Sequence, residues 1–190
     1  MNNKDLIIDK TIEMIEKNPD GLKNLTIREI AKQCNIAVGL VNYHFSSKDE
    51  LINVAVNKII NGIVGKFSAV RDKIENLYPV EKLVFLGDMT FDYLFEHYQI
   101  SKISILSDIE NPCENSNTEM TFQAYVPIIK NIRPELSDFD VKSLAFQLVI
   151  VMQQSFVRHD IIFRQFGIDL TDKEQRHKYH KDMVKRIVCV

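Results

Sequence analysis

One stretch of the chain decides its fold, residues 26–51, which read Thr26-Ile-Arg-Glu-Ile-Ala-Lys-Gln-Cys-Asn-Ile-Ala-Val-Gly-Leu-Val-Asn-Tyr-His-Phe-Ser-Ser-Lys-Asp-Glu-Leu51. The pattern predicts two short helices joined by a tight turn and followed by a third helix. The first helix should begin with a capping box, in which the Thr26 hydroxyl accepts from the Glu29 N–H and the Glu29 side chain reaches back. Asn35 suits the left-handed residue of the turn, and a second helix, 38–45, follows at once. This is a helix-turn-helix, whose second helix fits the major groove of DNA.

The stretch resembles the N-terminal DNA-binding domain of TetR-type (TetR/AcrR) transcriptional regulators. The resemblance covers roughly 6–51 and rests on an amphipathic first helix together with Gly21, Thr26, Ile30, Ala31, Gly39, His44, Phe45, Lys48, Glu50 and Leu51. Three positions depart from the family pattern: Asn35 stands where Gly is usual, Ala37 where Ser or Thr is frequent, and Asn42 where a phosphate-contacting Tyr is usual. Ala37 removes a preferred N-cap. We expect the phosphate contact to pass from position 42 to Tyr43.

The candidate DNA contacts divide by the work that each side chain can do, since phosphate contacts position a protein and base-edge contacts select sequence. The predicted phosphate contacts are Thr26, Tyr43, His44 and Lys48, while Arg28 could reach either bases or phosphate. If Val41 and Phe45 pack inward, the second helix presents four residues outward. They are Val38, Gly39, Leu40 and Asn42. Asn42 can pair with adenine through two hydrogen bonds, and Val38 or Leu40 can touch a thymine methyl group.

Several of these residues also have a purely structural explanation. Thr26 would cap its helix whether or not DNA is present. Lys48 is equally typical of a solvated surface, and Tyr43 and His44 are equally typical of partly buried packing positions.

The bulk composition is that of an ordinary soluble globular protein. The 190 residues are 45% hydrophobic and 26% charged with a formal net charge of −2, so the chain as a whole does not attract nucleic acid. Three widely separated cysteines, Cys34, Cys113 and Cys189, favour neither a disulfide framework nor a zinc cluster. The first residues form no apolar core region of signal-peptide length, and no apolar run comes near the roughly 18 residues of a membrane span. We therefore expect a cytoplasmic protein with no membrane partner.

The remainder of the chain is periodic in the manner of helices, so we expect an all-α protein. We divide it into a helix-turn-helix DNA-binding domain, 1–50, and a helical ligand-binding and dimerisation domain, 51–190. A long helix that starts at a second capping box, Ser47 to Glu50, should join them. The further helices are expected over 80–98, 100–109, 120–132 and 140–163 and from the capping box at Thr171, with an acidic surface loop over 107–118. Pro127 should bend or break the helix that contains it.

The helix expected over 140–163 is apolar on too many sides for an ordinary surface helix. One stripe is Val141, Leu144, Leu148, Val151 and Phe156, and a second is Phe146, Val149, Ile150 and Val157. The last helix shows the same excess. Both helices could lie deep in the core of a monomer, but we prefer a helical bundle formed with a second copy, as the resemblance implies. The predicted dimer contacts are Leu144, Leu148, Val151, Phe156, Tyr179, Met183 and Ile187.

The resemblance also implies a small-molecule effector that binds in the second domain. The middle helices offer an apolar or planar ligand their aromatic and methionine side chains, although most of these are more typical of a core. The candidates are Phe67, Phe85, Met89, Tyr93, Phe122 and Tyr125, with His97 and Gln123 as polar anchors.

Enzymatic function is not indicated, because the chain has no glycine-rich phosphate loop, no Gly-x-Ser-x-Gly and no Cys-x-x-Cys. His177 and His180 could bind a metal from one helix face, but no acidic or cysteine partner is evident beside them, so we interpret them as part of a solvated face. We expect neither a metal nor a cofactor. The preferred hypothesis is a homodimeric regulator, a repressor of a palindromic operator that a small apolar or aromatic ligand releases. The alternative, which Ala37 and Asn42 keep open, is a helical interaction protein whose helix-turn-helix no longer binds DNA.

Overall fold

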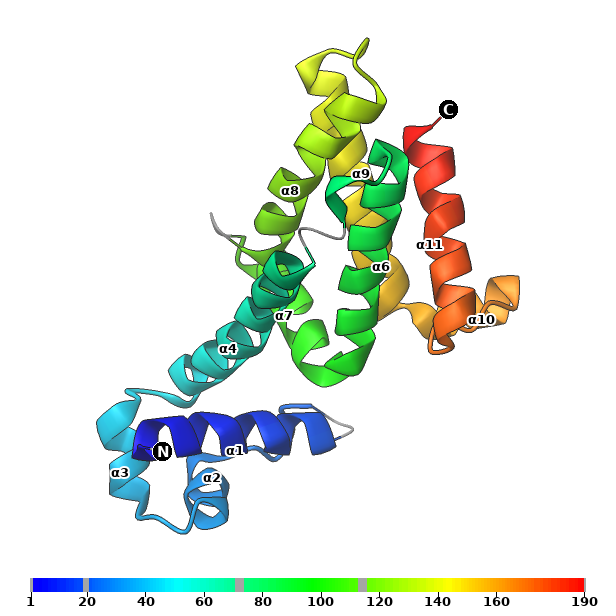
Figure 1. Cartoon of the computed structure of the whole chain (residues 1–190). Helices are drawn as coiled ribbons and strands as arrows, with labels where there is room; N and C mark the ends of the chain where they lie inside the picture. Colours follow the sequence, from blue (N-terminus) through cyan, green and yellow to red (C-terminus); the bar gives the residue numbers. More distant parts are fainter. Residues whose placement is uncertain (1, 19–20, 71–73, 113–115, 190) are drawn as a thin grey trace. The chain divides into compact units, whose positions relative to one another are not determined.

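The computed structural model describes residues 2–18, 21–70, 74–112 and 116–189, with the backbone but not the side chains of 63–69. Every regular element in these ranges is an α-helix, which confirms the predicted all-α fold class (Figure 1). Packing divides the chain into two compact units, Met1–Val64 with His97–Ser104, and Gly65–Glu96 with Ile105–Val190. The division that the sequence suggested, between residues 50 and 51, lies inside the first unit.

The first unit contains α1 (Asn3–Lys17), α2 (Ile27–Gln33), α3 (Val38–His44), most of α4 (Lys48–Ala69) and the start of α7 (Tyr98–Glu110). Helix α1 packs against α2 and α3, which also pack against each other. Their shared core consists of aliphatic side chains with almost no exposure, among them Ile7, Ile15, Ile30, Val41, Leu51, Ala55 and Ile100. Because the start of α4 supplies part of this core, the unit continues beyond residue 50.

Local hydrogen bonds explain where the short helices begin and turn. The Glu29 N–H donates to Thr26 Oγ1 at 3.1 Å, as predicted, while the Glu29 carboxylate accepts from Gln33 Nε2 at 3.4 Å in place of the expected reach back to Thr26. Asn35 has φ +54°, which confirms the left-handed turn residue between α2 and α3. At the start of α4 the Glu50 carboxylate accepts from the Ser46 N–H (2.7 Å) and from the Ser46 hydroxyl, and these bonds lower the pKa of Glu50.

The second unit is a helical bundle made of α6 (Pro79–Glu96), the remainder of α7, α8 (Asn117–Ile132), α9 (Asp138–Val157), α10 (His159–Phe166) and α11 (Lys173–Val188). Helix α8 packs against α6 and α9, α11 packs against the same two helices, and α10 packs against α9. Figure 1 shows α6, α8, α9 and α11 side by side. The bundle core includes Leu83, Phe91, Tyr125, Ile129, Leu148, Phe156 and Val184, all fully or almost fully buried.

One prediction about these helices was wrong, and of the bend or break predicted at Pro127 the break does not occur. The helix expected over 140–163 is two helices, because α9 ends at Val157 and α10 begins at His159 after a break at Arg158. Pro127 does not break α8, which continues to Ile132. Pro127 and Gln123 are both exposed, so the Gln123 carbonyl, which would have accepted from an N–H at position 127, can bond to water. The loop expected over 107–118 is shorter, because α7 reaches Glu110 and α8 starts at Asn117, and 113–115 with Cys113 lie outside the described residues.

The interpretation of His177 and His180 as a solvated helix face was also wrong. His180 is fully buried and its Nδ1 lies 2.7 Å from Asp88 Oδ1, while His177 Nε2 lies 2.9 Å from Asp92 Oδ1. The two carboxylates stand one turn apart on α6, far away in sequence, so no pattern near the histidines could reveal them.

Two basic side chains of α11, Arg176 and Lys173, complete this cluster. Asp92 accepts from Arg176 Nη2 at 2.7 Å and lies 2.9 Å from Lys173 Nζ. Burial by itself would raise the pKa of Asp92, but hydrogen bonds from Arg176, Lys173 and His177 outweigh it and hold that pKa below its usual value. Arg176 also donates to the Leu170 carbonyl at 2.8 Å. The cluster thereby fixes α11 against α6.

Among the described residues no group of three or more His, Cys, Asp and Glu side chains is arranged to hold a metal ion. In the same ranges none of the helices combines the length and the apolar character that a membrane crossing needs.

Candidate nucleic-acid interface

Helix α3 turns one face to the core of the first unit and the other to solvent. Val41 and Phe45 are buried, as predicted from their spacing. Four of the predicted DNA contacts on this segment are exposed, namely Val38, Gly39, Asn42 and Tyr43, and Leu40 and His44 are half-buried. With seven residues the helix is about 10 Å long, and the major groove, about 12 Å wide, admits a helix. The core contacts therefore hold in place a short polar and apolar surface that could meet base edges.

Tyr43 is the most exposed large side chain of this surface, at 82%. Its ring stands edge-on to the imidazole of His44, with the centroids 5.2 Å apart. The alternative explanation, a partly buried packing role, is excluded for Tyr43. It holds in part for His44, which is half-buried and also lies 6.4 Å from the ring of Phe45.

The start of α2 brings a hydroxyl and an ammonium group together. The exposed Thr26 caps the helix, and Lys48 Nζ donates to the carbonyl of the preceding residue, Leu25, at 3.0 Å. Lys48 is therefore held in place and is not a freely solvated surface lysine. Arg28 is exposed half a turn further along α2. The sequence pattern identified Lys48, but it could not reveal the hydrogen bond from Lys48 to the Leu25 carbonyl, because the two residues are 23 positions apart.

The predicted ligand-binding residues do not form one group. In the second unit Tyr93 and Tyr125 are buried, Phe85, Met89 and Phe122 are half-buried, and Gln123 is exposed and donates to Glu119 at 2.6 Å. Burial raises the pKa of the Tyr125 hydroxyl. His97 belongs to the first unit, where its Nδ1 lies 3.4 Å from Glu16 Oε1 and burial raises the pKa of Glu16. Phe67 lies outside the residues whose side chains are described.

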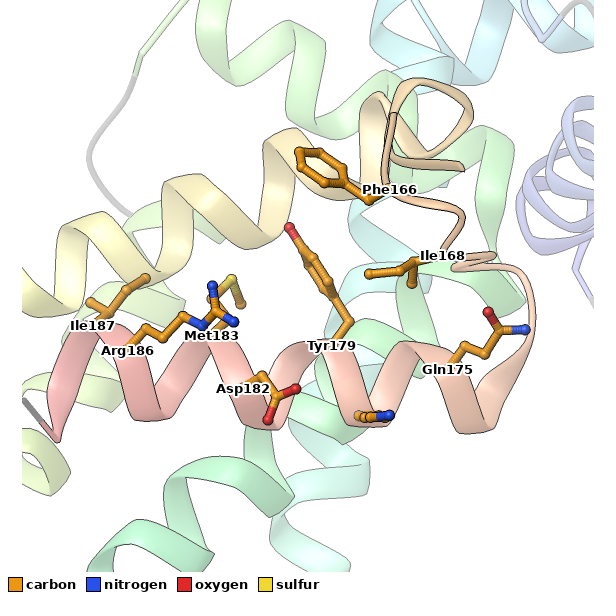
Figure 2. Close-up of a pocket in the computed structure, with 9 residues that line it drawn as sticks. Phe166, Ile168, Gln175, Tyr179, Asp182, Met183, Arg186 and Ile187 are labelled. Carbon is orange, nitrogen blue, oxygen red and sulfur yellow. The ribbon is translucent and has the colours of Figure 1, made fainter. Parts of the chain in front are cut away.

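A groove of about 540 Å³ runs along α11 (Figure 2). Its lining residues are Phe166, Ile168, Gln175, Lys178, Tyr179, Asp182, Met183, Arg186 and Ile187. None of the predicted ligand contacts lines it, whereas three of the predicted dimer contacts do. Of the other four predicted dimer contacts, Leu148 and Phe156 are buried in the core of the chain itself, as the alternative of a monomer core predicted. Leu144 and Val151 are partly exposed.

The first unit matches the model of a known protein family. Residues 7–55 match the model of the family described as bacterial regulatory proteins, tetR family. This part of the chain is similar to the tetR family. The match spans the helix-turn-helix and the start of α4, and the resemblance inferred from the sequence is thereby confirmed.

Two curated transcriptional regulators are similar to this chain over part of their length. The HTH-type transcriptional regulator SAB2452 of Staphylococcus aureus is 26% identical over 91 residues, which cover 48% of this chain and 45% of that protein. The HTH-type transcriptional repressor KstR2 of Mycolicibacterium smegmatis is 30% identical over 77 residues, 40% of this chain and 36% of that protein. The chain thus matches less than half the length of these relatives. They are regulators and not enzymes.

Solved structures extend the likeness to the whole fold. A TetR-like transcriptional regulator from Rhodococcus sp. RHA1 superposes with a TM-score of 0.68 at 13% identity, over 96% of this chain and 93% of that one. The fatty acid degradation regulator FadR from Bacillus halodurans gives a TM-score of 0.62 at 16% identity, over 95% and 96%. At such identities the likeness establishes the fold of this chain.

Proposed function

We propose that this chain is a cytoplasmic, homodimeric transcriptional regulator that binds double-stranded DNA through α3. It acts as a repressor at a palindromic operator, and a small apolar or aromatic effector releases it. The observation that carries the proposal is the exposed surface of α3, which Val41 and Phe45 anchor to the core from the opposite face. The curated relatives, one of them named a repressor, support the same class of function.

The chemistry of the exposed residues divides the DNA contacts. Asn42 can read adenine through two hydrogen bonds, and Val38 can touch a thymine methyl group. Thr26, Tyr43 and His44 supply hydroxyl and imidazole groups for phosphate oxygens, and Lys48 supplies a cation that its bond to Leu25 already orients. Arg28 is exposed beside them. In a twofold dimer two such surfaces would read two half-sites about one helical turn, roughly 34 Å, apart.

The effector would act by selecting between conformations. A ligand that binds the second unit can lower DNA affinity only if it prefers a conformation in which the two α3 helices are wrongly spaced. Aromatic and methionine side chains of α6 and α8 give that unit an apolar interior, which suits an apolar or aromatic effector.

The test is selection of bound sequences from random duplex DNA, followed by titration of the enriched site. We expect a palindrome bound by two chains. Asn42→Ala should weaken binding to that site by about 10-fold or more, because a two-bond base contact discriminates by about 1–3 kcal/mol. Asn61→Ala is the matched control, since Asn61 is exposed on α4 and should leave affinity unchanged. Selection that enriches no sequence, with or without candidate apolar ligands, would instead favour a helical interaction protein with a vestigial helix-turn-helix.

A further inference from the structure

The start of α1 lies beside α3 in the first unit (Figure 1). Lys4, in the first turn of α1, is exposed, and its Nζ lies 5.7 Å from the centroid of the Phe45 ring. Phe45 is buried and comes directly after the last residue of α3. Lys4 therefore places an exposed cation at the end of the helix that is proposed to meet DNA.

A row of rings connects this cation to two of the proposed phosphate contacts. The centroid of the Phe45 ring lies 6.4 Å from that of His44, and the His44 centroid lies 5.2 Å from that of Tyr43. Tyr43 is exposed and His44 is half-buried. The Lys4 ammonium group thus lies at the same end of α3 as Tyr43 and His44.

The charge of Lys4 is not taken up by an ion pair. Of the three lysines of α1, Lys10 and Lys17 both pair with Glu13, at 2.5 and 2.6 Å. Lys4 forms no such pair with a carboxylate in the part of the chain that the structure describes. Its ammonium group is therefore available to a negatively charged partner.

The carboxylate of Glu50 is near Lys4 but already has other partners. It accepts from the N–H and the hydroxyl of Ser46 at the start of α4. These hydrogen bonds lower the pKa of Glu50 more than the charge of Lys4 does. Glu50 thus belongs to the cap of α4 and leaves Lys4 free to contact a ligand.

We propose that Lys4 is a further phosphate contact, which extends the DNA interface from α3 to the start of α1. Duplex DNA carries one negative charge per about 1.7 Å of its axis, and a helix in the major groove has a phosphate backbone on either side. A cation at the end of α3 therefore meets phosphate whatever bases the helix contacts. The inference rests on DNA binding through α3, as proposed above. The sequence pattern did not reveal Lys4, because Phe45 is far from it along the chain.

A purely structural role for Lys4 predicts a different result. An ammonium group over an aromatic ring is itself a favourable contact, so Lys4 could simply cover Phe45. Loss of that contact would change the free energy of unfolding but not the salt dependence of DNA binding. Loss of a phosphate contact changes the salt dependence, because each neutralised phosphate releases counterions.

The test is the affinity for a random-sequence DNA duplex of about 30 base pairs, measured by fluorescence anisotropy at several salt concentrations. Lys4→Met removes the charge and keeps an unbranched apolar side chain. It should weaken binding by about 5-fold and reduce the slope of log affinity against log salt by about 1 for each bound chain. Lys4→Arg keeps the charge and should keep the slope of the parent.

Lys17→Met is the matched control. Lys17 lies in the last turn of α1, about 20 Å along the helix from Lys4, and its side chain is 75% exposed. Its replacement removes the same charge from the same helix and should leave affinity and slope unchanged. An equal loss of slope in Lys17→Met and Lys4→Met would show an effect of overall charge and would overturn the contact.

Urea unfolding of the same variants separates the two roles of Lys4. A Lys4→Met chain with lower stability but the salt slope of the parent would overturn the phosphate contact while leaving DNA binding through α3 in place. A parent chain that binds the duplex at no salt concentration would overturn both the contact and the proposed function.

Discussion

Replacing Gly87 by alanine should destabilise the second unit, although alanine is the better helix former. Gly87 is buried in α6, and a Cβ atom there would lie 2.1 Å from Cε1 and 2.3 Å from Nε2 of His180. His180 is fully buried, and its Nδ1 lies 2.7 Å from Asp88 Oδ1. The imidazole cannot move away from the new methyl group without losing that hydrogen bond.

Three contributions give the size of the effect. Helix propensity favours alanine over glycine by about 1 kcal/mol. Forcing extra volume into a packed core costs about 1–3 kcal/mol, and the lost hydrogen bond to a charged group costs about 1.5–3 kcal/mol. The free energy of unfolding should therefore fall by about 2–4 kcal/mol. In a chain of this size the melting temperature should fall on the order of 10 °C.

Urea unfolding at one fixed protein concentration, followed by circular dichroism, measures this change. Gly39→Ala is the matched control, since nothing lies within 4 Å of a Cβ at that position in α3, and it should stabilise by up to about 1 kcal/mol. In a His180→Ala background the ring is gone, so Gly87→Ala should cost almost nothing. The reasoning is refuted if Gly87→Ala is as stable as the parent, or if its cost is the same with and without the His180 ring.

Three further predictions concern single contacts. Lys48→Ala should weaken binding to all DNA sequences and reduce the slope of log affinity against log salt by about 1; titrations at several salt concentrations measure this, and an unchanged slope would exclude a phosphate contact. Asn35→Ala should lower the free energy of unfolding by about 1 kcal/mol, because φ is +54° at this residue, while Asn35→Gly should be no less stable in the same urea titration. The pKa of Asp92 is held below its usual value, so its stabilising contribution is present above the ordinary aspartate pKa and is lost as pH falls through the lower folded-state value. The stability advantage of the parent over Asp92→Asn should therefore be constant above about pH 4 and shrink below it; an advantage that is unchanged at pH 3 would contradict this.

The features that the sequence predicted correctly are those that depend on neighbouring residues. Thr26 caps α2 and Asn35 makes the left-handed turn because a few adjacent backbone atoms decide both conformations. The spacing of Val41 and Phe45 likewise decides which side of α3 is buried, and with it which side chains can meet DNA. For these reasons the helix-turn-helix and its family could be inferred from about 45 residues.

Local patterns were less informative where a helix has apolar residues on several sides. Two apolar stripes on α9 could each face the core or a partner, and the structure places Leu148 and Phe156 of the first stripe inside the chain, while Phe146 of the second is exposed. The sequence also continued this helix into α10, because the apolar period does not change at Arg158. Only the packing of neighbouring helices decides between such faces.

The sequence by itself thus determined the short helices and the turn of the helix-turn-helix and the exposed surface of α3, since these follow from contacts within one or two helical turns. Only the tertiary structure decided that His177 and His180 meet Asp92 and Asp88, because those partners lie 85 and 92 residues away. It also decided that α10 stays exposed beside a groove. Contacts between distant segments depend on how whole helices pack, and no short stretch of sequence contains that information.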